Sequence, residues 1–348
     1  MNCPVSLPSR YSIIGQTEGG QGVIFICNDS ELERQVIVKC LKDSTQQHRI
    51  IDEIKALQQI RSKHVVEIYD LISDDNNIAL LLEYINGSEL AQYGLKDRNV
   101  PTQLKILYQI ACGIADIHSF NHIHRDIKPY NMKVDGEGIV KILDFGLSRQ
   151  ENVDDRTVGF NGTPGFAAPE LYSAGTVNFT SAIDVYAFSC SVWLLCTGVL
   201  PAELRSRPPV TMTQRLRDSS RLPPEVADLI DTGLAVNPKA RPQMREIKDL
   251  LGRYLVHGQH QGIAYLGSQT YKISSSNKLI SIRFGVNEIK IGYDDLDFLV
   301  KEVSGEVKIN NQIVSVGMKL PTSCIMAMGI HPRVSFVPFD ISNPEVVL

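Results

Sequence analysis

The sequence predicts an α+β fold in which a small β-rich unit, a larger helical unit and a small all-β unit follow one another. Three observations favour this order. Short β-branched runs separated by glycines dominate residues 11–84, apolar residues at helical spacing dominate residues 85–256, and short alternating runs return from residue 279. With 348 residues, the chain is long enough for two or three compact units.

The first unit is expected to be a sheet that carries one helix, because its β-branched and aromatic runs are typical of hairpin strands. A separate run repeats isoleucine and leucine at helical spacing, and an Asp- and Asn-rich segment is typical of a turn. We expect strands over residues 23–26, 36–38, 65–69 and 78–84, a helix over residues 50–60 and a turn at residues 74–77.

The second unit is expected to be mainly helical, with helices over residues 104–114, 181–197, 224–234 and 243–254. Residues 185–202 carry no charge and approach the length of a membrane-spanning helix. Because Ser189, Gly198 and Pro201 interrupt this run and no basic residues flank it, we interpret it as a buried helix and expect no membrane association.

The last unit is expected to be a small β-sandwich-like domain over residues 279–348. Residues 257–262 are polar and contain two glycines, so residues 257–278 are interpreted as a linker. Alternating apolar runs punctuated by Gly, Asn and Asp then predict strands over residues 279–284, 288–291, 306–309, 312–316 and 334–339.

Composition limits the classes of function. A formal net charge of −4 gives no basic field, so we expect no nucleic-acid partner. The seven cysteines are scattered without a metal-ligand spacing, which favours free thiols in a reducing compartment and a cytoplasmic location. Residues 1–10 contain two prolines and no apolar run, so they are interpreted as an N-terminal extension and not as a signal peptide.

The strongest chemical signal is the loop at residues 124–131, which contains Asp126, Lys128 and Asn131. Phosphoryl transfer to an alcohol needs a carboxylate to accept the hydroxyl proton, a cation near the phosphoryl oxygens and ligands for Mg²⁺. These three side chains supply such groups within one loop. The alternative is a charged surface loop that follows a helix.

A second carboxylate, Asp144, comes directly after the strand-like run at residues 140–143 and precedes Phe145 and Gly146. In this position it can reach a metal ion that bridges nucleotide phosphates. The tripeptide alone is typical of any turn, but its position eighteen residues after Asp126 makes it a candidate metal ligand together with Asn131.

Lys39 closes a β-branched strand and is a candidate for holding nucleotide phosphates, with Glu53 as the carboxylate that would fix its side chain. The preceding glycine-rich turn provides Gly19, Gly20 and Gly22, followed by Ile24. Its backbone N–H groups would contact phosphates even though Thr17 stands where the first glycine of such loops is usual.

These motifs, in this order, resemble the eukaryotic-type protein kinase family over residues 11–256, and later segments at residues 162–170, 184–186 and 237–242 extend the resemblance. The resemblance implies a two-lobed fold, with an N-lobe at residues 11–84 and a C-lobe at residues 85–256. It also implies that ATP lies in the cleft, that Mg²⁺ is the metal and that protein substrates are the acceptors.

The resemblance also assigns roles to single residues. Leu82 corresponds to the gatekeeper, while Glu83 and Ile85 belong to the hinge that contacts adenine. Lys128 and Thr163 are similar to the serine/threonine branch of the family, which implies transfer of the γ-phosphate to Ser or Thr hydroxyls, with autophosphorylation. Beside Asp126, Arg125 implies regulation by phosphorylation, for which the candidate sites are Ser148, Thr157 and Thr163. The family's buried ion pair would join Glu170 and Arg241.

Besides Thr17, two further positions depart from the family pattern: Tyr130 stands where glutamate is usual, and Ser189 stands where glycine is usual. Neither removes a catalytic group. A pseudokinase remains an alternative because of the irregular glycine turn. A small-molecule phosphotransferase of related fold is a second alternative, against which the peptide-platform segment at residues 162–170 argues.

The tail carries a weaker resemblance. Residues 289–293 and 308–312 are similar to forkhead-associated domains, which bind phosphothreonine, but Tyr293 occupies the place of the phosphate-contacting arginine of that family. We therefore expect a degenerate or unrelated β-domain that docks on the kinase unit or on a protein partner.

Overall fold

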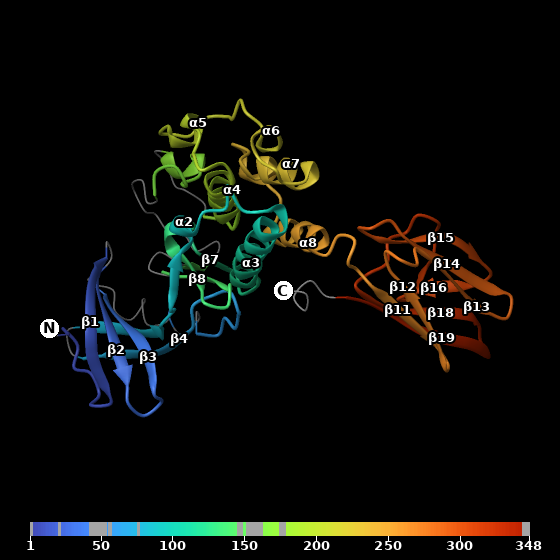
Figure 1. Ribbon diagram of the computed structural model, residues 1–348, viewed down its shortest axis with the longest axis horizontal. Helices are drawn as coiled ribbons and strands as arrows, with labels where there is room; N and C mark the ends of the chain where they lie inside the picture. Colours follow the sequence, from blue (N-terminus) through green and yellow to red (C-terminus); the bar gives the residue numbers. More distant parts are fainter. Residues whose placement is uncertain are drawn as a thin grey trace. The chain divides into compact units, whose positions relative to one another are not determined.

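A computed structural model describes residues 3–19, 22–41, 54, 58–74, 77–144, 149–150, 163–173 and 179–342 of the chain. The chain forms two compact units, Met1–Lys248 and Asp249–Leu348 (Figure 1). Most of the predicted helix at residues 50–60 lies outside the described residues, although Ile54 is helical and buried. No helix among the described residues has both the length and the apolar character needed to cross a membrane.

The first unit begins with a five-stranded antiparallel sheet in the order β1-β2-β3-β5-β4. Its strands are β1 (Tyr11–Gly19), β2 (Gly22–Asp29), β3 (Arg34–Leu41), β4 (Ile68–Ser73) and β5 (Ile78–Glu83). The four predicted strands are present, but the third begins at Ile68 instead of residue 65.

Side chains along β2 and β3 alternate between the two faces of this sheet, as the pleat requires. One face carries the residues that line a cavity: Ile24, Ile26, Ile37 and Lys39. The opposite face carries an apolar core of Phe25, Cys27, Val36, Val38 and Cys40. The N-terminal extension packs on this second face through the buried Val5, with Cys3 and Leu7 beside it.

The rest of the first unit is mainly helical, as predicted, and its core is formed by α3 and α4. Asn99 caps α3 because its side chain accepts a hydrogen bond from the backbone N–H of Thr102. The helices are α2 (Leu90–Tyr93), α3 (Val100–Ser119), α4 (Ala182–Thr197), α5 (Ala202–Arg205), α6 (Leu216–Ser219), α7 (Pro224–Gly233) and α8 (Met244–Leu255).

Short strands and 3₁₀ turns hold the loops between these helices. Two small sheets, in the orders β6-β8-β9 and β10-β7, flank the loop at residues 124–131. Their elements are β6 (Gly87–Glu89), β7 (His122–Ile123), β8 (Met132–Asp135), β9 (Val140–Ile142) and β10 (Arg149–Gln150), with 3₁₀ turns η1 (Pro129–Asn131), η2 (Pro169–Tyr172) and η3 (Pro238–Ala240).

The departure from the family pattern at Ser189 has a structural explanation. Ser189 is fully buried in α4, and its hydroxyl lies against Gly233 of α7. A Cβ atom on Gly233 would come within 2.2 Å of this hydroxyl oxygen. The larger residue on α4 is therefore accommodated by the absence of a side chain on α7.

After the end of α8, the second unit is all-β, as predicted, and contains a six-stranded sheet in the order β12-β11-β19-β18-β16-β17 and a three-stranded sheet in the order β13-β14-β15. Apolar residues from both sheets share one core. The strands are β11 (Gly262–Leu266), β12 (Gln269–Ile273), β13 (Leu279–Phe284), β14 (Asn287–Tyr293), β15 (Phe298–Ser304), β16 (Val307–Ile309), β17 (Gln312–Ile313), β18 (Ser323–Ile330) and β19 (Arg333–Ile341).

The linker predicted at residues 257–278 is wrong, because β11 and β12 lie inside it and belong to the six-stranded sheet. β11 pairs with β19 near the end of the chain, so its partner lies far away in sequence. The boundary also differs from the predicted residue 256. It falls within α8, between Lys248 and Asp249, so the second half of α8 belongs to the second unit, where Arg253 forms an ion pair with Asp297.

Candidate functional site

The first unit contains a cavity of about 400 Å³ between its five-stranded sheet and the loop at residues 124–131. Seven residues predicted to bind ATP or metal line it: Ile24, Lys39, Leu82, Glu83, Ile85, Asn131 and Asp144. Sequence reasoning missed four apolar lining residues: Ile26, Ile37, Val66 and Leu143. Ile26 and Ile37 lie on the same faces of their strands as Ile24 and Lys39, so the alternation of side chains along a strand could have predicted that they line the cavity.

Four predicted residues are not brought to this cavity by the described structure. Gly19 and Gly22 pair with each other at the end of the β1–β2 hairpin, and neither lines the cavity. Gly20 and Glu53 lie outside the described residues. The predicted phosphate contacts of the glycine turn and the predicted Lys39–Glu53 pair therefore stay predictions.

Backbone hydrogen bonds to one buried carboxylate fix the loop at residues 124–131. Asp184 is fully buried at the start of α4 and accepts hydrogen bonds from the backbone N–H groups of His124 and Arg125, both at 2.8 Å. The Nε2 atom of His118 donates a third bond to Asp184 at 2.9 Å. Burial raises the pKa of Asp184, but the bond from His118 and the other donors bring the pKa below its ordinary value.

Sequence reasoning did not find this anchoring role, since Asp184 appeared only as part of a later motif. A lone aspartate at a helix start gives no signal that its partner lies about 60 residues earlier. Arg125 itself has a φ of 70°, a left-handed conformation that a non-glycine residue adopts only when its surroundings hold it. Its guanidinium stacks on the ring of Phe179 at 3.7 Å.

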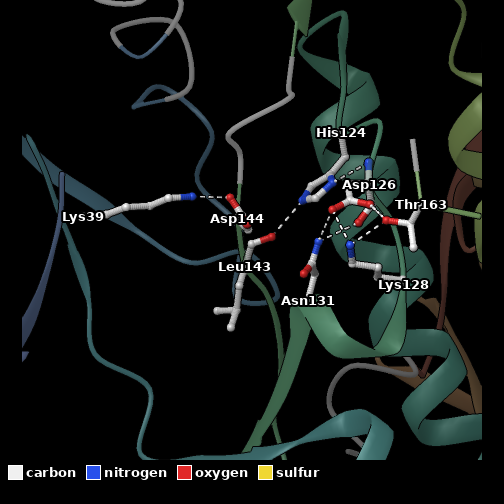
Figure 2. A network of polar contacts seen from close by, with 8 residues as sticks. All are labelled: Lys39, His124, Asp126, Lys128, Asn131, Leu143, Asp144 and Thr163. Atoms are coloured by element: carbon white, nitrogen blue, oxygen red, sulfur yellow. Dashed lines mark hydrogen bonds and ion pairs between the residues drawn. The ribbon is translucent and has the colours of Figure 1, made fainter. Parts of the chain in front are cut away.

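The predicted catalytic residues form one hydrogen-bonded cluster (Figure 2). Lys128 Nζ donates to Asp126 Oδ2 at 2.7 Å, and Asn131 Nδ2 donates to the same oxygen at 2.8 Å. Thr163 joins the cluster from the far side, because its hydroxyl donates to Asp126 Oδ1 and accepts from Lys128 Nζ, both at 2.7 Å. The cluster fixes the direction in which the Asp126 carboxylate points.

The cluster also sets the proton affinity of Asp126. Burial raises the pKa of this carboxyl, but the hydrogen bonds from Lys128, Thr163 and Asn131 outweigh burial and bring the pKa below its ordinary value. Asp126 is therefore an anion near neutral pH and can accept a hydrogen bond from an alcohol. Because these donors hold it in place, little reorganisation is needed when a substrate hydroxyl arrives.

Two further groups face each other across the cavity. Lys39 Nζ forms an ion pair with Asp144, which follows Leu143 at the end of β9 (Figure 2). The carbonyl of Leu143 accepts a hydrogen bond from His124 Nε2 at 2.9 Å, and its N–H donates to the carbonyl of Asn131 at 2.8 Å. These bonds join the segment that carries Asp144 to the loop that carries Asp126.

The donor set fits a magnesium ion. Asn131 uses its Nδ2 group to donate to Asp126, which leaves its carboxamide oxygen as the ligand atom. Asp144 contributes a carboxylate, and both residues line the cavity. Oxygen ligands of these two kinds are those that Mg²⁺ takes in proteins, with water and substrate phosphates completing the shell.

The predicted ion pair between Glu170 and Arg241 is confirmed. The two guanidinium nitrogens Nη1 and Nη2 of Arg241 each donate to one oxygen of Glu170 at 2.7 Å, which is a bidentate pair. Arg241 also donates to the backbone carbonyls of Ala182 and Ala235. The pair thus joins the segment after Thr163 to the start of α4 and to the turn before α8.

Of the three candidate phosphorylation sites, only Thr163 lies within the described residues; Ser148 and Thr157 lie outside them. Because the Thr163 hydroxyl already bridges Asp126 and Lys128, a phosphate there would break both bonds. The position of Thr163 is thus better explained by support of Asp126 than by regulation.

Replacing Thr163 by valine tests this bridging position. We expect kcat to fall roughly 10- to 100-fold, since a hydrogen bond to a charged group contributes about 1.5–3 kcal/mol. The lost donor no longer lowers the pKa of Asp126, so the acid limb of the pH–kcat profile should move to higher pH. Thr163→Ser keeps the hydroxyl and should retain both rate and profile. An unchanged profile in Thr163→Val would contradict the bridge.

Comparison with known proteins agrees with this geometry. Residues 9–250 match the family model described as a protein kinase domain. The chain is 30% identical over 207 residues to maternal embryonic leucine zipper kinase of Xenopus tropicalis, covering 57% of this chain and 31% of that protein. It is 32% identical over 200 residues to cyclin-dependent kinase-like 2 of Oryctolagus cuniculus, covering 54% and 35% respectively. The matched region spans about a third of the length of these relatives.

Proposed function

The chain belongs to the protein kinase family, and from this premise we propose that it is an ATP-dependent serine/threonine protein kinase with autophosphorylation. The observation that carries the proposal is the cluster of Asp126, Lys128, Asn131 and Thr163 beside a cavity lined by Lys39 and Asp144. This set supplies a base, a cation and ligands for Mg²⁺, which are groups that phosphoryl transfer to an alcohol requires.

In the proposed binding mode, adenine lies against the apolar wall of the cavity, which includes Ile24, Leu82 and Leu143. The backbone of Glu83 and Ile85 would hydrogen-bond its edge. Lys39 would release Asp144 and hold the α- and β-phosphates. Magnesium held by Asp144 and the carboxamide oxygen of Asn131 would neutralise phosphate charge.

Asp126 would orient the acceptor hydroxyl and take its proton as the γ-phosphoryl group leaves ADP. Lys128, 2.7 Å from Asp126 Oδ2, would lie beside the phosphoryl oxygens and stabilise their charge. Lys128 and Thr163 both contact Asp126 and resemble the serine/threonine branch of the family, which supports serine or threonine as the acceptor.

The wider setting is also proposed. Protein substrates and a cytoplasmic location are supported by the family and by the absence of disulfides, since all seven cysteines are free thiols. We propose that the β unit docks a protein partner or the kinase unit. Two exposed apolar side chains on the outer face of the paired strands β18 and β19, Ile325 (53% exposed) and Phe336 (67% exposed), support this role.

The function is tested by incubating the full chain with γ-labelled ATP, Mg²⁺ and a generic protein substrate, followed by hydrolysis to phosphoamino acids. We expect label in phosphoserine and phosphothreonine, and some label on the chain itself. Asp144→Ala, prepared identically, controls for contaminating kinases. Mg-ATP binding without transfer would support a pseudokinase, and label in phosphotyrosine alone would contradict the proposed acceptor class.

A further inference from the structure

Cysteines gather on the face of the first sheet opposite the cavity. Cys27 on β2 and Cys40 on β3 are buried in the core on this face, and the partly exposed Cys3 packs against it from the N-terminal extension. The sulfur atoms of Cys3 and Cys40 are 3.5 Å apart although the residues are 37 positions apart in sequence. The buried Val5 holds the intervening segment against the sheet.

We propose that Cys3 and Cys40 are a redox-sensitive thiol pair that closes to a disulfide when a hydroperoxide oxidises it. The disulfide would tether the N-terminal extension to the strand that carries Lys39. A disulfide needs sulfurs about 2.05 Å apart, so the two atoms have to approach by only about 1.5 Å. Rotation of the Cys3 side chain at the edge of the core supplies such a movement.

The two thiols differ in a way that assigns their order of reaction. Cys3 is partly exposed and can meet a solvent oxidant, whereas 95% of the surface of Cys40 is covered. Burial raises the pKa of Cys40 to about 12, with its bond to Cys3 as a smaller cause, so Cys40 is a poor first nucleophile. Cys3 is therefore the residue that is oxidised first, and Cys40 is the residue that resolves it.

The chemistry balances with hydrogen peroxide as the oxidant. The Cys3 thiolate attacks one peroxide oxygen, the O–O bond breaks, and Cys3 becomes a sulfenic acid while the leaving hydroxide takes a proton to form water. The sulfur of Cys40 then attacks the sulfur of Cys3. Its thiol proton and the sulfenic hydroxide leave as a second water. Two thiols lose two electrons and two protons, and one peroxide becomes two waters.

A Cys3–Cys40 disulfide would lie behind the strand that presents Lys39 to the cavity. Lys39 and Cys40 are neighbours on β3 and point to opposite faces of the sheet, so Cys40 lies directly behind the strand position that presents Lys39. Cys40 is also paired with Val23 of β2 and Ala79 of β5. A covalent link at Cys40 would therefore act on the central strand of the sheet.

The test treats the reduced full chain with hydrogen peroxide, blocks remaining thiols by alkylation and maps cross-linked peptides by mass spectrometry. We expect a Cys3–Cys40 cross-link that a thiol reductant removes, and a rise of roughly 5 °C in the thermal midpoint of the first unit. Cys3→Ser should lose both effects. Cys27→Ser removes a neighbouring buried thiol and should keep both.

Several outcomes would overturn the proposal that Cys3 and Cys40 form a disulfide. These are a cross-link from Cys3 to Cys27, overoxidation of Cys3 without any cross-link, or no modification of Cys3. Cys40→Ala provides a second variant in which the Cys3 sulfenic acid should accumulate unresolved and react with a dimedone probe. A Cys40→Ala chain in which peroxide produces no dimedone adduct at Cys3 would contradict the assigned order.

A second measurement rests on the proposed function. In the fully oxidised chain, we expect the KM for ATP to change at least twofold and to return after reduction, because the bond acts on the strand of Lys39. An unchanged KM in cross-linked enzyme would overturn the link to Lys39. If the chain has no kinase activity, the cross-link map still reports on the thiol pair, so the two failures are distinguishable.

Discussion

Replacing Asp126 by asparagine is expected to lower kcat by roughly 1,000-fold, because general base catalysis contributes about 10²- to 10⁴-fold. Asparagine has nearly the same shape as aspartate but accepts no proton. It also loses the charge that attracts Lys128, which lies 2.7 Å away in the wild-type chain. The loss should therefore appear in the chemical step.

Binding of ATP should survive this substitution. Asp126 is not among the residues that line the cavity, so the dissociation constant of Mg-ATP should change less than threefold. Single-turnover kinetics and a separate nucleotide titration measure the two effects. Asp97→Asn is the matched control, because Asp97 is exposed and does not line the cavity, and it should change neither quantity. A variant Asp126→Asn with near wild-type kcat would exclude Asp126 as the base.

The success of the sequence analysis at Asp126 has a physical reason. The base, the cation and the amide of the cluster lie within six consecutive positions of one loop, so their proximity follows from chain connectivity. Lys39 and Asp144 were also predicted, since each directly follows a strand-like apolar run, at residues 36–38 and 140–143. The helices over residues 181–197 and 224–234 were confirmed nearly to their ends because their apolar runs have clear starts.

The contacts that sequence reasoning missed are long-range. Thr163 reaches Asp126 from 37 positions away, and Asp184 reaches Arg125 from 59 positions away. The residue types around one position do not predict which residue far away in the sequence will contact it. In the β unit, β18 was missed because its inward positions are Cys324, Met326 and Met328, which are weaker strand signals than β-branched residues. β11 was missed because its partner residues on β19 lie 75 to 79 positions later in the chain.

The bidentate ion pair between Glu170 and Arg241 predicts the largest loss of stability. We expect Arg241→Leu to lower the free energy of unfolding of the first unit by about 3–5 kcal/mol, since removing one partner leaves the other charge uncompensated. The side chain of Arg241 is completely buried, and that of Glu170 is 18% exposed. The carbonyls of Ala182 and Ala235 also lose their donor.

Trp193 provides the measurement, because it is the only tryptophan of the chain and is buried in α4 of the same unit. Its fluorescence during urea unfolding should report a lower midpoint in Arg241→Leu.

Arg217→Leu is a matched control: its pair with Asp228 has a similar length of 2.9 Å, but both side chains are more than 40% exposed. Exposed pairs contribute about 0–1 kcal/mol, so the control should shift the midpoint little. Equal shifts in the two variants would show that the buried Glu170–Arg241 pair contributes no more to the free energy of unfolding than an exposed pair. In the double variant Glu170→Gln with Arg241→Leu, part of the stability should return, because no unpaired charge is left in the buried site.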